Sequence, residues 1–107
     1  MKRIMLCCSA GMSTSLLVRK MKEVAAERGE EVQIDAFRAS EFDEKFRDYQ
    51  VVLLGPQVRY MQADLSKRAA EFNIPVETIN MMDYGMQRGD NVLDFAYGLI
   101  AQEGSRV

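Results

Sequence analysis

Apolar positions alternate along the chain between short runs that predict strands and longer stripes that predict helices. The segments Arg3–Cys7 and Val51–Leu54 are almost continuously apolar, which is typical of parallel strands covered on both faces. Glu31–Phe37 alternates between polar and apolar residues, which predicts a strand at the edge of a sheet. Ile74–Ile79 predicts a further strand. Pro75 is compatible with this strand, because it stands near the start, where no ladder hydrogen bond is lost.

Between these strands, apolar residues recur every three or four positions, which is the spacing of amphipathic helices. The first helix is expected to run from Met12 or Ser13 to Arg28. Ser13 is a suitable N-cap, and Gly29 is a suitable residue to end the helix.

A second helix is expected over residues 57–72, directly after Pro56, which suits the first turn of a helix. A cap at Asp90 or Asn91 opens the last helix, and residues 80–89 before it are expected to form a loop. The apolar stripe of the second helix consists of Val58, Met61, Leu65, Ala69 and Phe72.

A weaker pattern lies between the edge strand and the strand at Val51–Leu54. Phe42 and Phe46 stand four residues apart and are expected to anchor a short helix or turn, while Ser40 and Asp43 resemble a weak capping box. Strands and helices therefore alternate along the chain, which predicts an α/β domain with a parallel sheet.

In such sheets the binding crevice lies beyond the carboxyl ends of the strands. Three segments of this chain are expected to meet there, namely Cys8–Ser15, Gly55–Tyr60 and Asn80–Gly89. These segments are therefore the first place to look for the chemistry of the protein.

The composition narrows what this crevice can do. A net charge of -2 at pH 7 argues against nucleic-acid binding, because no basic excess exists to displace counterions from phosphates. No apolar run approaches the ~20 residues that span a bilayer, and the short apolar stretch at the start is a poor signal peptide. We therefore expect a cytoplasmic protein, and the two adjacent cysteines are expected to be free thiols in that reducing compartment.

The chain contains no histidine, which excludes a Cys–His or Ser–His catalytic pair within it. The commonest zinc ligand is also missing, so neither a metal nor another cofactor is expected. Any imidazole that takes part in the reaction must come from another molecule.

The candidate site is the turn that begins at Cys8 and leads from a strand into a helix. A helix N-terminus carries unpaired N–H groups and a partial positive charge, which favour a thiolate and bind the oxygens of a phosphoryl group. Gly11 lets the backbone turn and lets a ligand approach closely. The uncharged residues that follow Cys8 in this turn are Ser9, Ala10, Gly11, Met12, Ser13, Thr14 and Ser15.

Three interpretations of this turn stay open from the residues alone. In the plainest one, Cys7 and Cys8 are buried core residues, Ser13 is only a cap, and the turn is at most an anion-binding feature without catalysis. Of the two cysteines, Cys7 continues the strand and belongs to the core, whereas Cys8 stands at the turn.

A low-molecular-weight cysteine phosphatase, or an enzyme like arsenate reductase, is the second interpretation. Phosphatases with a Cys-x5-Arg loop would need arginine at position 14, where this chain has Thr14, and Arg19 is expected to point away. The loop can then accept and hold a phosphoryl group without the means to hydrolyse it, which is the profile of a phospho-carrier and the third interpretation.

The motifs Cys8–Leu17 and Val52–Gln57, with Asp83–Gly85 after the last strand, resemble a known family. This family is the IIB component of the bacterial sugar phosphotransferase system, in its lactose/cellobiose (diacetylchitobiose) class. The resemblance implies one domain over residues 1–107. It also implies a four-stranded parallel sheet flanked by helices on both faces, similar to low-molecular-weight tyrosine phosphatases.

The resemblance also implies a phosphotransferase reaction. Cys8 would accept a phosphoryl group from a phosphohistidine on a IIA protein and pass it to a sugar held by the membrane-embedded IIC component. That sugar is expected to be a β-linked disaccharide such as cellobiose, chitobiose or lactose. The absence of histidine agrees with this scheme, because the donor imidazole belongs to the partner.

Other residues near the crevice are weaker candidates. Gln57, Arg59 and Tyr84 are candidates for contacts with a partner or with the loop. Asp83 would be unwelcome near a phosphate unless it faces away, and as a general acid it would favour a phosphatase. The chain is expected to be a monomer, because the helix stripes leave no long apolar patch.

The chain has eight methionines, which is a high count. Met21 and Met61 are expected in the core. Met12, Met82 and Met86 are equally suited to the core and to an apolar surface whose flexible side chains bind different partner proteins.

Overall fold

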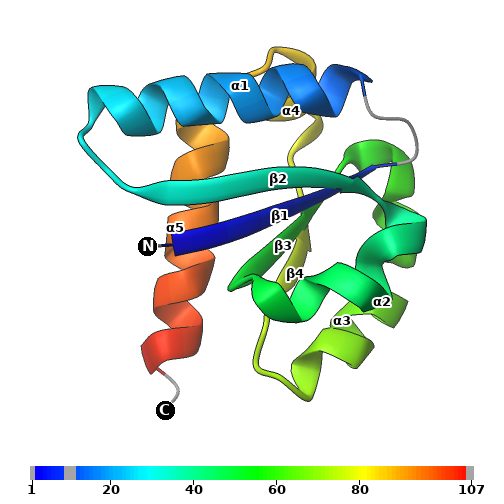
Figure 1. The fold of residues 1–107 in the computed structure, drawn as a ribbon. Helices are drawn as coiled ribbons and strands as arrows, with labels where there is room; N and C mark the ends of the chain where they lie inside the picture. The colour runs from blue at the N-terminus through cyan, green and yellow to red at the C-terminus, as the bar shows by residue number, and fades with distance from the viewer. Residues whose placement is uncertain (1, 9–11, 106–107) are drawn as a thin grey trace.

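The computed structural model describes residues 2–8 and 12–105, and parallel strands form the centre of this part of the chain (Figure 1). The sheet has four strands in the order β2-β1-β3-β4. The strands are β1 (Lys2–Cys8), β2 (Val32–Arg38), β3 (Val51–Leu54) and β4 (Val76–Thr78). All pairings are parallel, and β2 lies at an edge, as its alternating pattern predicted.

Helices cover both faces of the sheet. On one face, α1 (Met12–Glu27) and α5 (Gly89–Ser105) pack on the strands and on each other, and α2 (Phe42–Lys45) and α3 (Gln62–Ala70) cover the other (Figure 1). The shorter elements are the 3-10 helices η1 (Ala39–Glu41), η2 (Phe46–Asp48) and η3 (Pro56–Met61), and the helix α4 (Met81–Gly85).

Side chains of β1 alternate between two hydrophobic cores. Ile4 and Leu6 belong to the core beneath α1 and α5, whereas Met5 and Cys7 belong to the core beneath α2 and α3. This alternation follows from the two-residue period of a strand. It places Cys8, the last residue of β1, on the same face as α1.

Both ends of α1 agree with the sequence, but its predicted N-cap does not. Gly29 has a φ of 69°, and the N–H groups of Gly29 and Glu30 donate to the carbonyls of Ala26 and Ala25, as in a glycine C-cap. The helix begins at Met12, so the prediction that Ser13 is its N-cap is wrong. Ser13 already lies inside the first turn.

The predicted helix over residues 57–72 is divided into two parts. Residues 56–61 form the 3-10 helix η3, and the backbone of Val58 (φ -116°, ψ 19°) interrupts the helical path before α3 begins. The α-helix ends at Ala70, because Asn73 adopts a φ of 58° and its N–H donates to Ala70. Phe72 lies beyond the helix and is 43% exposed, although the predicted stripe placed it in the core.

The short helix between β2 and β3 is confirmed, but its capping box is wrong. Phe42 and Phe46 are buried and their rings stack with centroids 4.5 Å apart. Glu41 is the N-cap of α2 and forms no side-chain capping bond, so Ser40 and Asp43 do not cap it.

The predicted loop over residues 80–89 contains the helix α4. The Asn80 side chain caps it, accepting hydrogen bonds from the N–H groups of Met82 at 2.8 Å and Asp83 at 3.4 Å. The last helix starts at Gly89, one residue before the predicted caps. A Cβ atom at Gly89 would lie 2.7 Å from the backbone of α1, so glycine permits this close approach of α5 to α1.

Candidate functional site

The strands β1, β3 and β4 end at the same edge of the sheet, and this edge carries the candidate site. Cys7 pairs with Leu54, and the Gly55 N–H donates to the carbonyl oxygen of Cys7 at 2.9 Å. On the next strand, the Ile79 N–H donates to Leu54 at 2.8 Å. The described parts of the three predicted segments therefore meet beyond the carboxyl ends of the strands, as expected.

The two cysteines occupy different environments. Cys7 lies in the core, and burial, the neighbouring Cys8 and Glu41 raise the pKa of its thiol to about 12. Cys8 ends β1 on the opposite face, is 1% exposed, and its sulfur contacts the backbone oxygen of Phe37 at 4.0 Å. Neither cysteine forms a disulfide bond with the other. The prediction that Cys7 is a core residue is confirmed.

The N-terminus of α1 lies at the same edge, because the helix begins at Met12 shortly after β1 ends (Figure 1). Its first-turn N–H groups belong to the set that a helix leaves unpaired. Ser9, Ala10 and Gly11 lie outside the described residues, and of Met12, Ser13 and Thr14 only the backbone is described. That this loop binds a phosphoryl group stays a prediction.

Gln57, Arg59 and Tyr84, which the sequence proposed separately, line one pocket of about 540 Å³. The Gln57 Nε2 donates a hydrogen bond to the Tyr84 hydroxyl at 3.1 Å and so joins η3 to α4 across it. The remaining lining residues are Pro56, Met81 and Gly85. This pocket opens beside the ends of β3 and β4.

Asp83 faces away from this pocket. Its Oδ1 accepts a hydrogen bond from the Asn91 side chain of α5 at 3.1 Å, and Asp83 is not among the pocket-lining residues. Its carboxylate therefore holds α4 against α5. This arrangement gives a phosphatase no support, because the candidate general acid is turned toward a structural partner.

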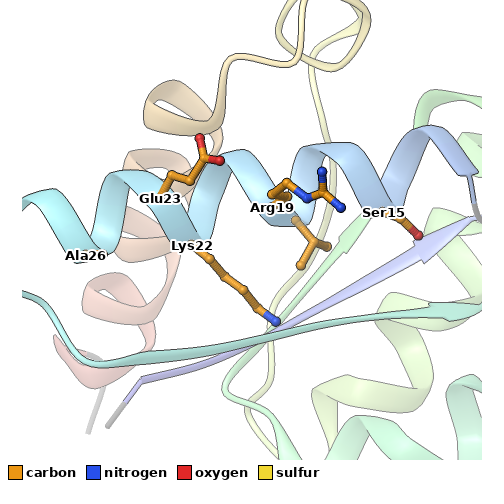
Figure 2. Close-up of a pocket in the computed structure, with 6 residues that line it drawn as sticks. Ser15, Arg19, Lys22, Glu23 and Ala26 are labelled. Carbon is orange, nitrogen blue, oxygen red and sulfur yellow. The ribbon is translucent and has the colours of Figure 1, made fainter.

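A shallow groove runs along the outer surface of α1 (Figure 2). Arg19 was expected to point away from the turn, but its guanidinium extends along α1 in the direction of Ser15 (Figure 2). The groove is lined by Ser15, Val18, Arg19, Lys22, Glu23 and Ala26. It thus brings two cations to the flank of the helix whose first turn belongs to the candidate site.

The methionines divide between the core and the surface. Met21 is fully buried and Met61 is partly buried against the second core, as predicted. Met81, Met82 and Met86 are 66%, 64% and 59% exposed, so α4 presents an apolar rim next to the pocket. The helix itself was missed from the sequence, although Asn80 followed by Asp83 three residues later is a capping signal.

The described residues contain no candidate metal centre and no candidate membrane span. No group of three or more histidine, cysteine, aspartate or glutamate side chains in this part of the chain could hold a metal ion. Over the same residues, no helix combines the length and the apolar character that crossing a membrane requires.

Comparisons with known proteins agree on one family. Residues 3–95 match the family model described as PTS system, Lactose/Cellobiose specific IIB subunit. The chain is 46% identical over 103 residues to the oligo-beta-mannoside-specific EIIB component of Bacillus subtilis (strain 168), covering 96% of this chain and 100% of that protein. It is 44% identical over 104 residues to the galactose-specific EIIB component of Lactococcus lactis subsp. cremoris (strain MG1363). This match covers 92% of this chain and 96% of that protein.

Solved structures give the same result. The cellobiose-specific IIB component from Borrelia burgdorferi superimposes with a TM-score of 0.80 at 34% identity, covering 95% of this chain and 94% of that one. The lactose-specific IIB domain from Streptococcus pneumoniae gives a TM-score of 0.82 at 17% identity, covering 91% of this chain and 95% of that one. The latter likeness shows the fold alone.

The predicted fold class is confirmed by these neighbours and by the sheet itself. IIB domains share the four-stranded parallel arrangement, with helices on both faces, with low-molecular-weight tyrosine phosphatases. The family match covers most of the chain, and two relatives with more than two fifths of their residues identical cover nearly all of it. The chain belongs to the lactose/cellobiose-specific IIB family of the sugar phosphotransferase system and is a phosphotransferase component of that system.

Proposed function

We propose that Cys8 is the phosphoryl acceptor of this IIB component. The observation that carries the proposal is its place at the end of β1, beside the start of α1. The loop Ser9–Ser15 is proposed to cradle the phosphoryl oxygens. Gln57, Arg59 and Tyr84 are proposed to contact the loop or the partners from the neighbouring pocket.

The reaction has two displacement steps. The Cys8 thiolate attacks phosphorus on the IIA phosphohistidine, so that a sulfur–phosphorus bond forms while the phosphorus–nitrogen bond breaks. The imidazole nitrogen leaves with the electron pair. In the second step a sugar hydroxyl oxygen attacks phosphorus, and the sulfur leaves as thiolate. The hydroxyl proton passes to a base on the sugar-binding partner.

The proposed partners are a IIA phosphocarrier and a membrane IIC component that holds the sugar. The related proteins are named for oligo-beta-mannoside, galactose and cellobiose, so we propose that the sugar is β-linked, such as cellobiose, chitobiose or lactose. The protein is proposed to work in the cytoplasm as a monomer, with residues 1–107 as one IIB domain and without a cofactor.

The test is transfer of a radiolabelled phosphoryl group from a phosphorylated IIA protein of the same class. The wild-type chain and Cys7→Ser are expected to become labelled, whereas Cys8→Ser is expected to remain unlabelled. Cys7→Ser is the matched control, because it removes the neighbouring thiol from the same strand. Equal labelling of Cys8→Ser and the wild type would show that Cys8 is not the acceptor.

The same preparation separates transfer from hydrolysis. A phosphatase would release inorganic phosphate steadily from an aryl phosphate, and the release would stop in Cys8→Ser. A phospho-carrier is expected to release none and to keep the label until a IIC component with sugar is added.

A further inference from the structure

Gly55 leaves a space that the side chain of Gln57 fills. A Cβ atom at position 55 would lie 2.5 Å from Gln57 Oε1 and 3.1 Å from its Cδ. The backbone of Gly55 (φ -63°, ψ 149°) is one that any residue adopts. A Cβ atom here would therefore displace the Gln57 amide, which folds back over the end of β3.

This space lies beside Cys8. Cys7 pairs with Leu54 and the Gly55 N–H donates to Cys7 O at 2.9 Å, so Gly55 and Cys8 directly follow the last paired residues of the two neighbouring strands. Leu53 and Leu6 both belong to the core beneath α1, and the two-residue period therefore assigns positions 55 and 8 to that same face. Neighbouring strands are about 4.8 Å apart. The Gln57 amide consequently stands one strand away from the Cys8 side chain.

Tyr84 fixes the orientation of this amide. Gln57 Nε2 donates to the Tyr84 hydroxyl at 3.1 Å, and the Tyr84 ring packs against the first core. The helix that carries Tyr84 is held at its start by the Asn80 cap and along its length by the bond between Asp83 and Asn91. A primary amide has two N–H groups, and the bond to Tyr84 uses one of them. The other can therefore donate to a second acceptor.

We propose that Gln57 donates this second N–H to the phosphoryl group on Cys8, with Tyr84 and Gly55 as positioning residues. The inference rests on the proposed role of Cys8. An amide donor stabilises phosphoryl oxygens without a fixed cation, and so favours holding the group for onward transfer. Tyr84 orients the donor, and Gly55 provides the room without which the donor would be displaced.

The test compares the side-chain amide signals of Gln57 by heteronuclear NMR before and after phosphorylation by a IIA protein. The wild-type signals are expected to move, while those of Gln50 stay in place. Gln50 is a suitable internal reference, because its Oε1 accepts from the Arg3 N–H at 2.9 Å at the opposite end of the sheet. In Tyr84→Phe and Gly55→Ala the movement is expected to shrink.

The equilibrium constant for transfer from IIA to Cys8 provides the second readout. Gln57→Leu is expected to lower it about tenfold, the size of one hydrogen bond to a charged group. Tyr84→Phe and Gly55→Ala are expected to lower it less, and Gly98→Ala, whose Cβ meets nothing within 4 Å, is the control. Gln57→Leu changes an exposed residue, so it tests the inference even where Gly55→Ala fails to fold.

The outcomes separate this inference from the proposed function. A labelled wild-type chain with unmoved Gln57 signals and an unchanged constant in Gln57→Leu overturns the inference and leaves the function intact. A wild-type chain that takes no label on Cys8 overturns both.

Discussion

At the amino ends of the strands charged side chains have partners, whereas the pocket at the carboxyl ends of β3 and β4 is lined mostly by neutral residues. Arg28 forms an ion pair with Asp94 at 2.7 Å, and the Lys2 ammonium lies 4.7 Å from the centre of the Tyr97 ring. At the other end, this pocket is lined by neutral residues except Arg59.

The difference shows what each end can do. At the amino ends, the Arg28–Asp94 pair joins the end of α1 to α5, and Lys2 of β1 contacts Tyr97 of α5. Neutral hydrogen-bond donors at the carboxyl ends do not repel the negative charge of a phosphoryl group, which is about -1.5 to -2 at neutral pH. Among the described residues of the pocket, Arg59 is the cation that can add to this attraction.

The largest expected effect comes from placing a negative charge at the neutral end. Gln57→Glu keeps the shape of the side chain, removes both donors and adds a carboxylate near the phosphoryl group. Loss of the donors costs about tenfold, as in Gln57→Leu, and charge repulsion at this exposed position adds about 1 kcal/mol, so the transfer equilibrium constant is expected to fall roughly 50-fold. Gln50→Glu makes the same chemical change at the amino ends and is expected to leave transfer unchanged. Equal losses in both variants would remove the contrast between the two ends.

The next effect concerns the close packing of α5 against α1 at Gly89. In Gly89→Ala the new Cβ meets the backbone of Lys20 and Met21 at 2.7 Å, and backbone atoms cannot move aside as a side chain does. We expect a loss of about 1–3 kcal/mol in the free energy of unfolding, measured by urea denaturation. Gly98→Ala, in an open part of the same helix, is expected to be neutral or stabilising by up to about 1 kcal/mol.

A third effect depends on pH. Burial raises the pKa of Asp35, but hydrogen bonds from Tyr49 at 2.6 Å and from Gln33 outweigh it, so that its pKa is lowered overall. Burial and the Asp35 carboxylate raise the pKa of Tyr49 to about 12. Removing the hydroxyl in Tyr49→Phe is expected to cost about 1 kcal/mol at pH 7.

The signs of the two shifts define the pH window of this cost. The folded pKa of Asp35 is depressed, so its contribution is complete above the unfolded value of about 4 and disappears as the pH falls through the lower folded value. The folded pKa of Tyr49 is raised, so its contribution is complete below about 10 and disappears as the pH rises toward 12. Urea denaturation of both chains across pH should show the difference narrowing on each side of this window.

The sequence was most informative where one interaction dominates. Val51–Leu54 could be identified as a central strand because every side chain in it is buried. Cys8 could be separated from Cys7 because Cys7 continues the apolar run of the strand, whereas Cys8 stands where the turn begins. The kink at Val58 could not be predicted, since the same apolar spacing suits a 3-10 turn followed by an α-helix. The helix α4 was missed because it is a single short turn whose cap, Asn80, also suits a loop.

The neighbourhood of Cys8 illustrates the same limit at the site. The sequence identified Gln57 and Tyr84 as candidates but could not join them, because their contact depends on how two connections fold over the sheet. The role of Gly55 was hidden for a different reason. Its backbone angles are ordinary, so only the position of the Gln57 side chain reveals why a Cβ is absent there.

The smallest expected effect comes from removing a paired charge at the amino ends. Arg28 and Asp94 are exposed, so water and salt screen their attraction even at 2.7 Å. Arg28→Met is therefore expected to change the urea midpoint only slightly and the transfer equilibrium not at all. Arg59→Met removes a cation at the neutral end and is expected to slow transfer from IIA, most clearly at low salt, because attraction of an incoming phosphoryl group is a long-range effect. If both variants slowed transfer equally, the net charge of the protein, and not the neutral end of its sheet, would govern the encounter.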